Sequence, residues 1–211
     1  MRPEERLALQ TARSAELRAW GYHLLCGVDE VGRGALAGPV AAGAVVLREP
    51  LDILGVDDSK RLTPLQRRRL APRIRARAVA VAVGYAAPRE IDRIGIVRAT
   101  QRAMRRALGR LGVRPDHLLV DAFALPDSDL PQIAIAKGDR LYAEIAAASI
   151  VAKVERDALM QRIAQEWPWY GWERNKGYGA GEHLAAIAAH GLSPWHRRSF
   201  CRELGAERAE G

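Results

Sequence analysis

The chain is poor in cysteine. Its 211 residues include only Cys26 and Cys201, which stand far apart in the sequence. Structural zinc sites take cysteine or histidine ligands at short, regular spacings, and two isolated cysteines supply no such spacing. They also supply no disulfide framework, so we expect two reduced thiols, with Cys26 in the core.

Long apolar runs are also missing, although 48% of the residues are hydrophobic. A membrane-spanning helix needs about 20 consecutive apolar residues, and no segment approaches that length. Residues 1–6 lack the apolar core of a secretory signal peptide. We therefore expect a cytoplasmic protein that has no membrane contact. As a separate expectation, the protein acts as a monomer.

Nucleotide-binding fingerprints are absent or stand in the wrong context. No G-x-x-x-x-G-K-[ST] loop occurs in the sequence. Residues 32–37, GRGALA, fit the dinucleotide pattern G-x-G-x-x-A, but this pattern should open a helix. Here Gly38-Pro39 leads into residues 40–47, an apolar run that favours a strand. The dinucleotide-binding interpretation is therefore disfavoured.

Positive charge is in excess, with 33 Lys and Arg against 25 Asp and Glu, for a net charge of +8. Lysine occurs only at positions 60, 137, 153 and 176, so arginine, whose planar fork suits phosphate geometry, carries most of the charge. Basic residues cluster within residues 67–77, 102–110 and 196–198. This distribution indicates a polyanionic partner, although the basic face of a helix over residues 96–111 also suits simple solvation.

The most informative segment is residues 24–34, LLCGVDEVGRG, in which an apolar strand ends in Asp29 and Glu30 before a Gly-Arg-Gly turn. Residues 117–121, HLLVD, show the same arrangement, because a short apolar run ends in Asp121. A single aspartate in that place is more often a turn residue or a helix N-cap, but two such strands and an acidic pair favour a ligand site. Consecutive strand residues face opposite ways, so the pair shares a site only if the strand twists or ends there.

Clustered carboxylates of this kind need a counter-charge. Two of them about 4 Å apart repel by roughly 4 kcal/mol at an effective dielectric near 20. Hard oxygen ligands without a Cys or His cluster suit Mg²⁺ or Mn²⁺. Such a donor set is typical of two-metal phosphodiester cleavage.

Hydrophobic periodicity predicts the order of the elements. Strands are expected near residues 23–31, 39–48, 78–87, 117–122 and 131–136, and helices near 64–77, 96–111 and from 139 or 140 to 165. Antiparallel strands followed by alternating strand and helix predict a mixed α/β sheet with flanking helices.

The C-terminal third concentrates aromatic residues. We expect three of its tryptophans, Trp167, Trp169 and Trp172, to form a hydrophobic cluster that caps the sheet, and its histidines, His183, His190 and His196, to be surface or capping residues. Tyr178 differs because glycines on both sides expose its ring on a pliable loop. A contact between this ring and a substrate and a place in the capping cluster are both open for Tyr178.

Taken together, the motifs resemble those of bacterial ribonuclease HII. They are GVDEVGRG at 27–34 with AGPV at 37–40, DDSK at 57–60, KGD at 137–139, AAASIVAKV at 146–154, KGYG at 176–179 and HRRSF at 196–200. The resemblance covers residues 23–201 in order. It implies a ribonuclease H-like fold, with a five-stranded mixed sheet, flanking helices and a C-terminal helical cap. We expect an N-terminal extension over 1–22, a catalytic domain over 23–166, and the cap and tail over 167–211.

The resemblance also implies an activity. This is hydrolysis of the RNA strand of RNA–DNA hybrids and cleavage 5′ of single ribonucleotides in duplex DNA, with two Mg²⁺ or Mn²⁺ ions and with 5′-phosphate and 3′-hydroxyl products. The implied metal-binding and catalytic acids are Asp29, Glu30, Asp121 and Asp139. The implied substrate-binding residues are Gly32, Arg33 and Gly34, which read the ribose 2′-hydroxyl, and Tyr178, which packs on the neighbouring sugar. Lys60 and Arg197 are further candidates for substrate binding.

The sequence departs from the family pattern in places without losing an acid. Asp121-Ala122-Phe123 stands where the family often has Asp-Gly-Asn, Asn175 where it often has His, and Ala180 where it often has Thr. A non-catalytic scaffold that binds hybrids would share the positive charge and the aromatic residues. It would not explain four acids at the ends of strands and helices.

Overall fold

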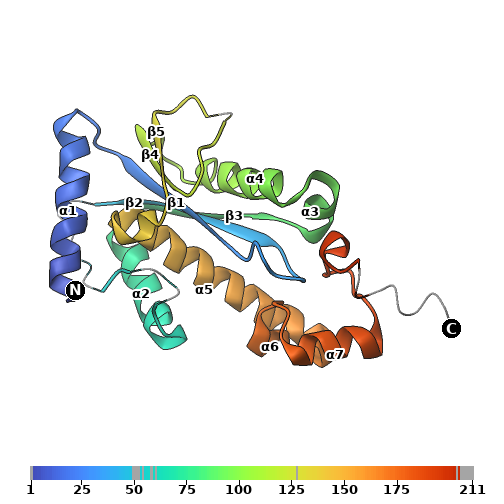
Figure 1. Cartoon of the computed structure of the whole chain (residues 1–211). Coiled ribbons are helices and arrows are strands. Elements are labelled where there is room, and N and C mark those ends of the chain that lie inside the picture. Colours follow the sequence, from blue (N-terminus) through green and yellow to red (C-terminus); the bar gives the residue numbers. More distant parts are fainter. Residues whose placement is uncertain are drawn as a thin grey trace.

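A five-stranded sheet forms the centre of the computed structural model, which describes residues 2–48, 53, 55–57, 59, 61–126, 128–202 and 204 (Figure 1). The strands are β1 (Leu25–Val31), β2 (Val40–Leu47), β3 (Ala78–Ala86), β4 (His117–Asp121) and β5 (Gln132–Ile135). Their order is β3-β2-β1-β4-β5; β1 to β3 pair antiparallel, and β4 and β5 run parallel to β1. The mixed sheet predicted from the sequence is confirmed, with each strand boundary within two residues of its predicted place.

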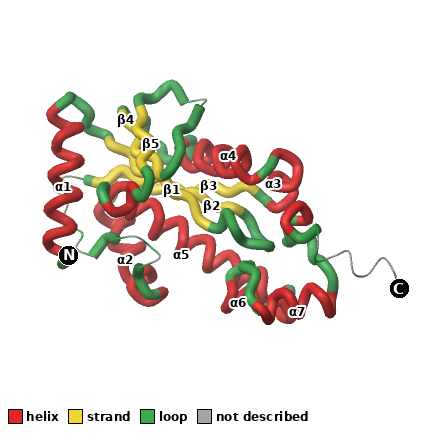
Figure 2. Tube along the Cα trace, viewed as in Figure 1, coloured by secondary structure: helices red, strands yellow, loops and turns green. Residues whose placement is uncertain are grey.

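Helices cover both faces of this sheet, as Figure 2 shows. They are α1 (Pro3–Ala19), α2 (Pro64–Arg77), α3 (Pro88–Ile94), α4 (Ile96–Leu108), α5 (Ala143–Glu166), α6 (Trp172–Asn175) and α7 (Gly181–His190). The prediction that the long helix begins at Asp139 or Arg140 is wrong, because those residues form a separate 3₁₀ turn, Gly138–Arg140, and α5 begins at Ala143. Within the described ranges, no helix is long and apolar enough to cross a membrane.

The core has two layers, one on each face of the sheet. Even-numbered residues of β1 such as Cys26 and Val28 pack with Met104 of α4, while the opposite face packs Val45 of β2 against Ile150 of α5. All five side chains are fully buried, and burying each large apolar one contributes about 1.5–3 kcal/mol. The predicted core position of Cys26 is confirmed.

The α5 helix lies directly on β1 because β1 has a glycine at the crossing. A Cβ atom added to Gly27 would lie 2.0 Å from the main-chain carbon of Glu144, so no other residue fits there without moving the helix. The buried alanines 146–148 extend this close approach along the helix. As a result, the first turns of α5 are held beside the carboxyl end of β1, where the acids stand.

The helix α1, which the sequence did not predict, packs through a polar face. Its buried residues are Arg6, Gln10, Ser14 and Leu17. The Ser14 hydroxyl donates a hydrogen bond to the fully buried Glu144 (3.0 Å), and Arg6 forms an ion pair with Asp57 (2.8 Å). Polar contacts therefore tie α1 to α5 and to the loop before α2. The domain boundary at residue 22 stays a prediction.

Candidate active site

Two acids stand where the central parallel strands separate. The pairing of β1 with β4 ends at Val28 and Val120, and Asp29 and Asp121 are the next residues of the two strands. In open α/β sheets, ligands bind in the crevice beyond the carboxyl ends of such strands. The register of the sheet thus brings two carboxylates, 92 positions apart in the sequence, to one edge.

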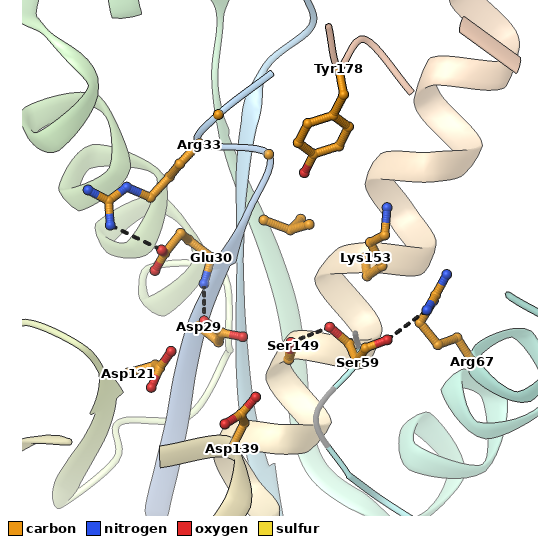
Figure 3. Close-up of a pocket in the computed structure, with 13 residues that line it drawn as sticks. Asp29, Glu30, Arg33, Ser59, Arg67, Asp121, Asp139, Ser149, Lys153 and Tyr178 are labelled. Carbon is orange, nitrogen blue, oxygen red and sulfur yellow. Dashed lines mark hydrogen bonds and ion pairs between the residues drawn. The ribbon is translucent and has the colours of Figure 1, made fainter. Parts of the chain in front are cut away.

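A cavity of about 320 Å³ opens at this edge (Figure 3). Its lining includes all four predicted acids, Asp29, Glu30, Asp121 and Asp139, together with Gly32, Arg33, Gly34 and Tyr178. The structure therefore brings eight of the ten predicted site residues together. Lys60 lies outside the described residues, and Arg197 does not line the cavity.

We call the part of the cavity that is lined by the four acids its floor. Asp29 lies there and is only 6% exposed. Burial raises the pKa of its carboxyl well above the usual value, and the charges of Glu30 and Asp121 raise it further, whereas a hydrogen bond from Ser149 lowers it. The backbone N–H of Glu30 donates to Asp29 Oδ1 (2.7 Å). The ionised form of Asp29 is thus short of positive partners.

Glu30 follows Asp29 and reaches the same cavity because β1 ends at the next residue, Val31. Arg33 donates to Glu30 Oε1 (3.4 Å), while Glu30 Oε2 is buried and has no hydrogen-bond partner among the described residues. Burial raises the pKa of the Glu30 carboxyl, and Arg33 opposes that shift. A buried carboxylate oxygen without a partner is energetically costly and available as a ligand.

The other two acids are linked through the main chain. The N–H of Gly138 donates to Asp121 Oδ1 (2.8 Å), which fixes the end of β4 against the 3₁₀ turn. That turn carries Asp139, which is 8% exposed and borders the cavity. Figure 3 shows both carboxylates below Asp29, on either side of it.

These four acids fit hard divalent cations by their chemistry. The described residues around the cavity include carboxylates but no Cys or His, which is the donor set that Mg²⁺ and Mn²⁺ prefer. In the described part of the chain, no three acidic, His or Cys side chains are placed to hold one ion, so the acids border the cavity rather than meet at a point. The orphaned oxygen of Glu30 and the raised pKa of Asp29 are both features that a cation would relieve.

The Gly-Arg-Gly loop beside the acids is held from beneath by buried arginines. Gly32 has φ +88°, and a Cβ there would lie 2.2 Å from Arg156 Nε. Arg156 is fully buried and donates to the carbonyls of Pro39 (2.9 Å) and Ala37 (3.1 Å). It also donates to the carbonyl of Lys176 (2.9 Å), which joins the loop to the segment that carries Tyr178.

Arg197 has a different place from the one predicted. It is fully buried and donates to the carbonyls of Gly32 (2.7 Å), Arg33 (2.7 Å) and Gly38 (3.0 Å). Burial lowers the pKa of its guanidinium to about 9, with the nearby charge of Arg156 adding to the effect. Its donors are engaged with main-chain oxygens, so the structure shows Arg197 shaping the loop from within.

Tyr178 enters the cavity from the cap. Its side chain is 36% exposed, and its ring lies 5.6 Å from the guanidinium of Arg156 and 5.9 Å from Lys153 Nζ, in cation–π geometry. The hydroxyl points toward the acids in Figure 3. The predicted tryptophan cluster is confirmed: Trp172 is fully buried in it, Trp167 packs against it, and Trp169, although 47% exposed, contacts the ring of Trp167.

Some polar neighbours of the acids were not singled out from the sequence. Ser149 and Lys153 line the cavity from α5 within the AAASIVAKV motif, and the Ser149 hydroxyl shares a hydrogen bond with Ser59 (2.8 Å). Arg67 of α2 lines the cavity and donates to the Ser59 carbonyl (2.6 Å). The basic face of α4 is partly neutralised, because Arg106 and Arg102 bind Glu90.

The fold and the carboxylate-lined cavity define the class of protein as a nuclease with a ribonuclease H-like fold. The family model "Ribonuclease HII" matches residues 26–203, so the chain belongs to the ribonuclease HII family. A ribonuclease HII of Desulfitobacterium hafniense is 48% identical over 196 residues, which cover 93% of this chain and 75% of that protein.

Solved structures agree with this assignment. The ribonuclease H2 of Pyrococcus horikoshii OT3 superposes with a TM-score of 0.75 at 28% identity, over 90% of this chain and 100% of that one. The structure of Bst-RNase HIII in complex with Mn²⁺ is similar in fold, with a TM-score of 0.71 at 21% identity over 89% of this chain and 70% of that one. The chain is therefore an endonuclease with ribonuclease H activity, from a family that acts on RNA–DNA substrates.

Proposed function

We propose that this protein hydrolyses the RNA strand of RNA–DNA hybrids and also cleaves on the 5′ side of a single ribonucleotide embedded in duplex DNA, leaving 5′-phosphate and 3′-hydroxyl ends. One observation carries the proposal. Four carboxylates, the Gly-Arg-Gly loop and an aromatic ring on a separate segment all line one cavity. Such a site combines a place for hydrolysis with a place for reading a sugar.

The four carboxylates are the groups that would hold two divalent cations, Mg²⁺ or Mn²⁺. Asp29 and Asp121, at the paired strand ends, are the central ligands, and Glu30 and Asp139 are the flanking ones. Cations held there would supply activation of a water for in-line attack on phosphorus and stabilisation of the departing 3′ oxygen. The hydrogen bond from Gly138 to Asp121 supports this role, because it fixes one carboxylate oxygen and thereby orients the other.

Basic side chains around the acids favour a phosphate backbone. Lys153 and Arg67 line the same cavity as the acids. Arg67 also borders a second cavity of about 320 Å³, beside Arg68 and Lys176. The lining of the second cavity also includes Asp157 and Glu173, and Lys153 forms an ion pair with Asp157 (2.6 Å), so the positive charge is partly compensated. The remaining excess of basic side chains beside the acids suits a nucleic-acid strand, since neutralising phosphates releases counterions.

Selection of a ribonucleotide requires a contact with its 2′-hydroxyl, which donates and accepts hydrogen bonds. A Cβ atom added to Gly34 would meet nothing within 4 Å, so the protein's own packing does not require a glycine there. We attribute this open space to a bound sugar, with Tyr178 packing on the neighbouring one. A site built to pair a hydroxyl rejects the analogue without it, because its own polar groups are then left unpaired.

We also propose a monomer in which residues 23–166 carry the acids and residues 167–211 supply the cap with Tyr178. The ring of Tyr178 contacts Lys153 and Arg156 of α5, which supports joint action of these two parts in one site.

A cleavage assay tests the proposal. The purified protein is incubated with end-labelled duplexes that contain an RNA strand, a single ribonucleotide, or DNA alone, in Mg²⁺, in Mn²⁺ and in EDTA. We expect cleavage of the first two duplexes only, dependent on metal, with a 5′-phosphate on the downstream product. Binding of all three duplexes without cleavage would instead identify a scaffold protein.

A further inference from the structure

A chain of hydrogen bonds between buried rings runs through the cap, between α6 and α7, and ends on Tyr178. His183 and His196 are 0% and 2% exposed, and their Nε2 atoms lie 3.1 Å apart. The indole N–H of Trp172 donates to His183 Nε2 (2.9 Å), and the backbone N–H of Ser193 donates to His196 Nδ1 (2.9 Å). At the other end, His183 Nδ1 lies 2.8 Å from the carbonyl oxygen of Tyr178.

The donors at the ends of this chain fix the proton on each ring. A backbone N–H can only donate, so His196 Nδ1 is an acceptor and His196 carries its proton on Nε2. That proton points at His183 Nε2, which also accepts from Trp172. His183 therefore carries its proton on Nδ1 and donates it to Tyr178. With both rings neutral, each N–H in the chain has an acceptor, and the single lone pair of His183 Nε2 is shared between the donors of Trp172 and His196.

The surroundings of the rings keep them neutral. Burial lowers the pKa of His183, and it outweighs the opposing effects of the hydrogen bond to the Tyr178 carbonyl and of the neighbouring carboxylate of Glu182. Burial also lowers the pKa of His196, to about 4, and the proximity of His183 adds to that effect. The ring of Tyr170 packs edge-on against both histidines, with centroids 6.0 and 4.7 Å away. The two histidines are thus fixed donors and acceptors at neutral pH.

The segment that receives this bond needs external support. Lys176 has φ +54° and Gly177 has φ +84°, so the main chain before Tyr178 is in the left-handed region at two successive residues. Non-glycine residues hold such a conformation only where surrounding bonds enforce it. The carbonyl of Tyr178 accepts two hydrogen bonds, one from the backbone N–H of Ala180 (2.8 Å) within the segment and one from His183 outside it, while the tyrosine ring extends into the cavity.

We propose that His183 is a positioning residue for Tyr178, and that His196 and Trp172 act by fixing the tautomer of His183. We call this chain of hydrogen bonds the histidine relay. Through it, the packing of the cap determines the position of the Tyr178 ring, which faces the substrate. The proposal rests on the proposed role of Tyr178 in recognising an embedded ribonucleotide. It adds a device for selectivity that does not touch the substrate or the acids.

A matched pair of variants at position 183 tests the histidine relay. His183→Asn keeps an amide donor near the place of Nδ1, whereas His183→Gln places its amide near Nε2 and leaves the Tyr178 carbonyl without this donor. We expect His183→Gln to cleave at a single ribonucleotide about five- to tenfold more slowly, which is the effect of losing one buried hydrogen bond, and His183→Asn to stay within about twofold of wild type. Equal losses in the two variants would overturn the proposal.

A second arm separates positioning from general support of the fold. In a Tyr178→Ala background, His183→Gln should cause no further loss, because its effect passes through the tyrosine. The same fractional loss in both backgrounds would show a purely structural role and overturn the proposal. Failure of the proposed function has another signature, since Tyr178→Ala alone would then cleave the single-ribonucleotide duplex at the wild-type rate.

Discussion

The floor of the cavity and the cap above it bury polar groups in opposite ways. At the floor, Asp29 and Glu30 are crowded acids with raised pKa values, and one oxygen of Glu30 has no partner within the described chain. In the cap and beneath the glycine loop, Arg197 and His183 are as deeply buried, yet their nitrogens bond to carbonyls and ring nitrogens. The first region is built to take up a ligand, and the second is built to hold a shape.

The largest effect is expected from removing an acid at the floor. Asp121→Asn preserves the volume of the side chain and removes the charge that would hold a cation. The cleavage rate should fall by about a thousandfold or more, which corresponds to roughly 4 kcal/mol of transition-state stabilisation. Single-turnover cleavage measures the rate, and fluorescence anisotropy should show retained binding of the duplex. Turnover at the wild-type level would exclude Asp121 as a ligand.

Two glycines of one loop, Gly32 and Gly34, allow a matched comparison. One is required by the packing of the protein, and the other leaves space that we assign to the substrate. Gly32→Ala puts a Cβ onto Arg156 at a positive φ, and should destabilise the fold by about 2 kcal/mol or more. Gly34→Ala meets no protein atom within 4 Å, so it should leave Tm unchanged and weaken cleavage at a single ribonucleotide. Thermal unfolding and steady-state kinetics distinguish the two variants. A Gly34→Ala enzyme with unchanged kinetics would remove the loop from the recognition of the sugar.

Tyr178 is the side chain through which the cap reaches the cavity. Tyr178→Ala should slow cleavage at a single embedded ribonucleotide by at least about tenfold, or ~1.4 kcal/mol, and Tyr178→Phe should be milder because it keeps the ring. Rates on duplexes with a ribonucleotide or with 2′-fluoro at the same position provide the control. If Tyr178→Ala cuts the junction as fast as wild type does, the tyrosine belongs to the cap alone.

The carboxylates at the floor lie close together, so we expect the protein to become more stable when the charge of Asp29 is removed. Folding raises the pKa of the Asp29 carboxyl, so this group is harder to ionise in the folded protein than in the unfolded chain. The free energy of unfolding therefore falls as pH rises from the ordinary pKa of an aspartate to the raised pKa of Asp29. Asp29→Asn lacks this loss and should melt above the metal-free wild type at neutral pH, by about 2–4 °C for each kcal/mol released. The difference should vanish in acid, where Asp29 is protonated. Equal Tm values of Asp29→Asn and the metal-free wild type at pH 7 would show that the ionised carboxyl of Asp29 does not destabilise the fold.

A smaller gain is expected at the residue after Asp121. Ala122 has φ +65°, a left-handed conformation that disfavours any residue with a Cβ. Ala122→Gly should therefore stabilise the protein by about 1 kcal/mol, as measured by denaturant unfolding. Destabilisation would show that tertiary contacts, rather than local strain, determine this turn.

The sequence predicted the parts of the molecule that depend on apolar periodicity. All five strands and the helices α2, α4 and α5 follow from it, and the acids of the cavity follow from carboxylates at strand ends together with the family motifs. The helix α1 was missed because the residues on its inner face are mostly polar, such as Arg6 and Ser14. Its burial depends on partners more than 50 positions away, Asp57 and Glu144, which no local pattern reveals.

The supporting groups of the site could not be predicted for a related reason. Arg197 was a candidate for substrate binding through the resemblance to the family, and in the structure its hydrogen-bond partners are main-chain oxygens of a distant loop. His183 and His196 were expected at the surface or in the cap, and the structure places both in the buried cap. Main-chain carbonyls carry no residue signature, so only the fold shows which side chains bind them.

One measurement tests the difference between floor and cap most directly. Cleavage rates of Asp139→Asn and Tyr178→Ala are compared on a long RNA–DNA hybrid and on a duplex with one ribonucleotide, and each variant is described by the ratio of its two rates. Loss of a flanking acid should slow both reactions alike and leave the ratio at its wild-type value. Loss of the tyrosine should lower the ratio for the single ribonucleotide by about tenfold. Equal changes of the ratio in both variants would contradict the division of labour between chemistry at the floor and selection by the cap.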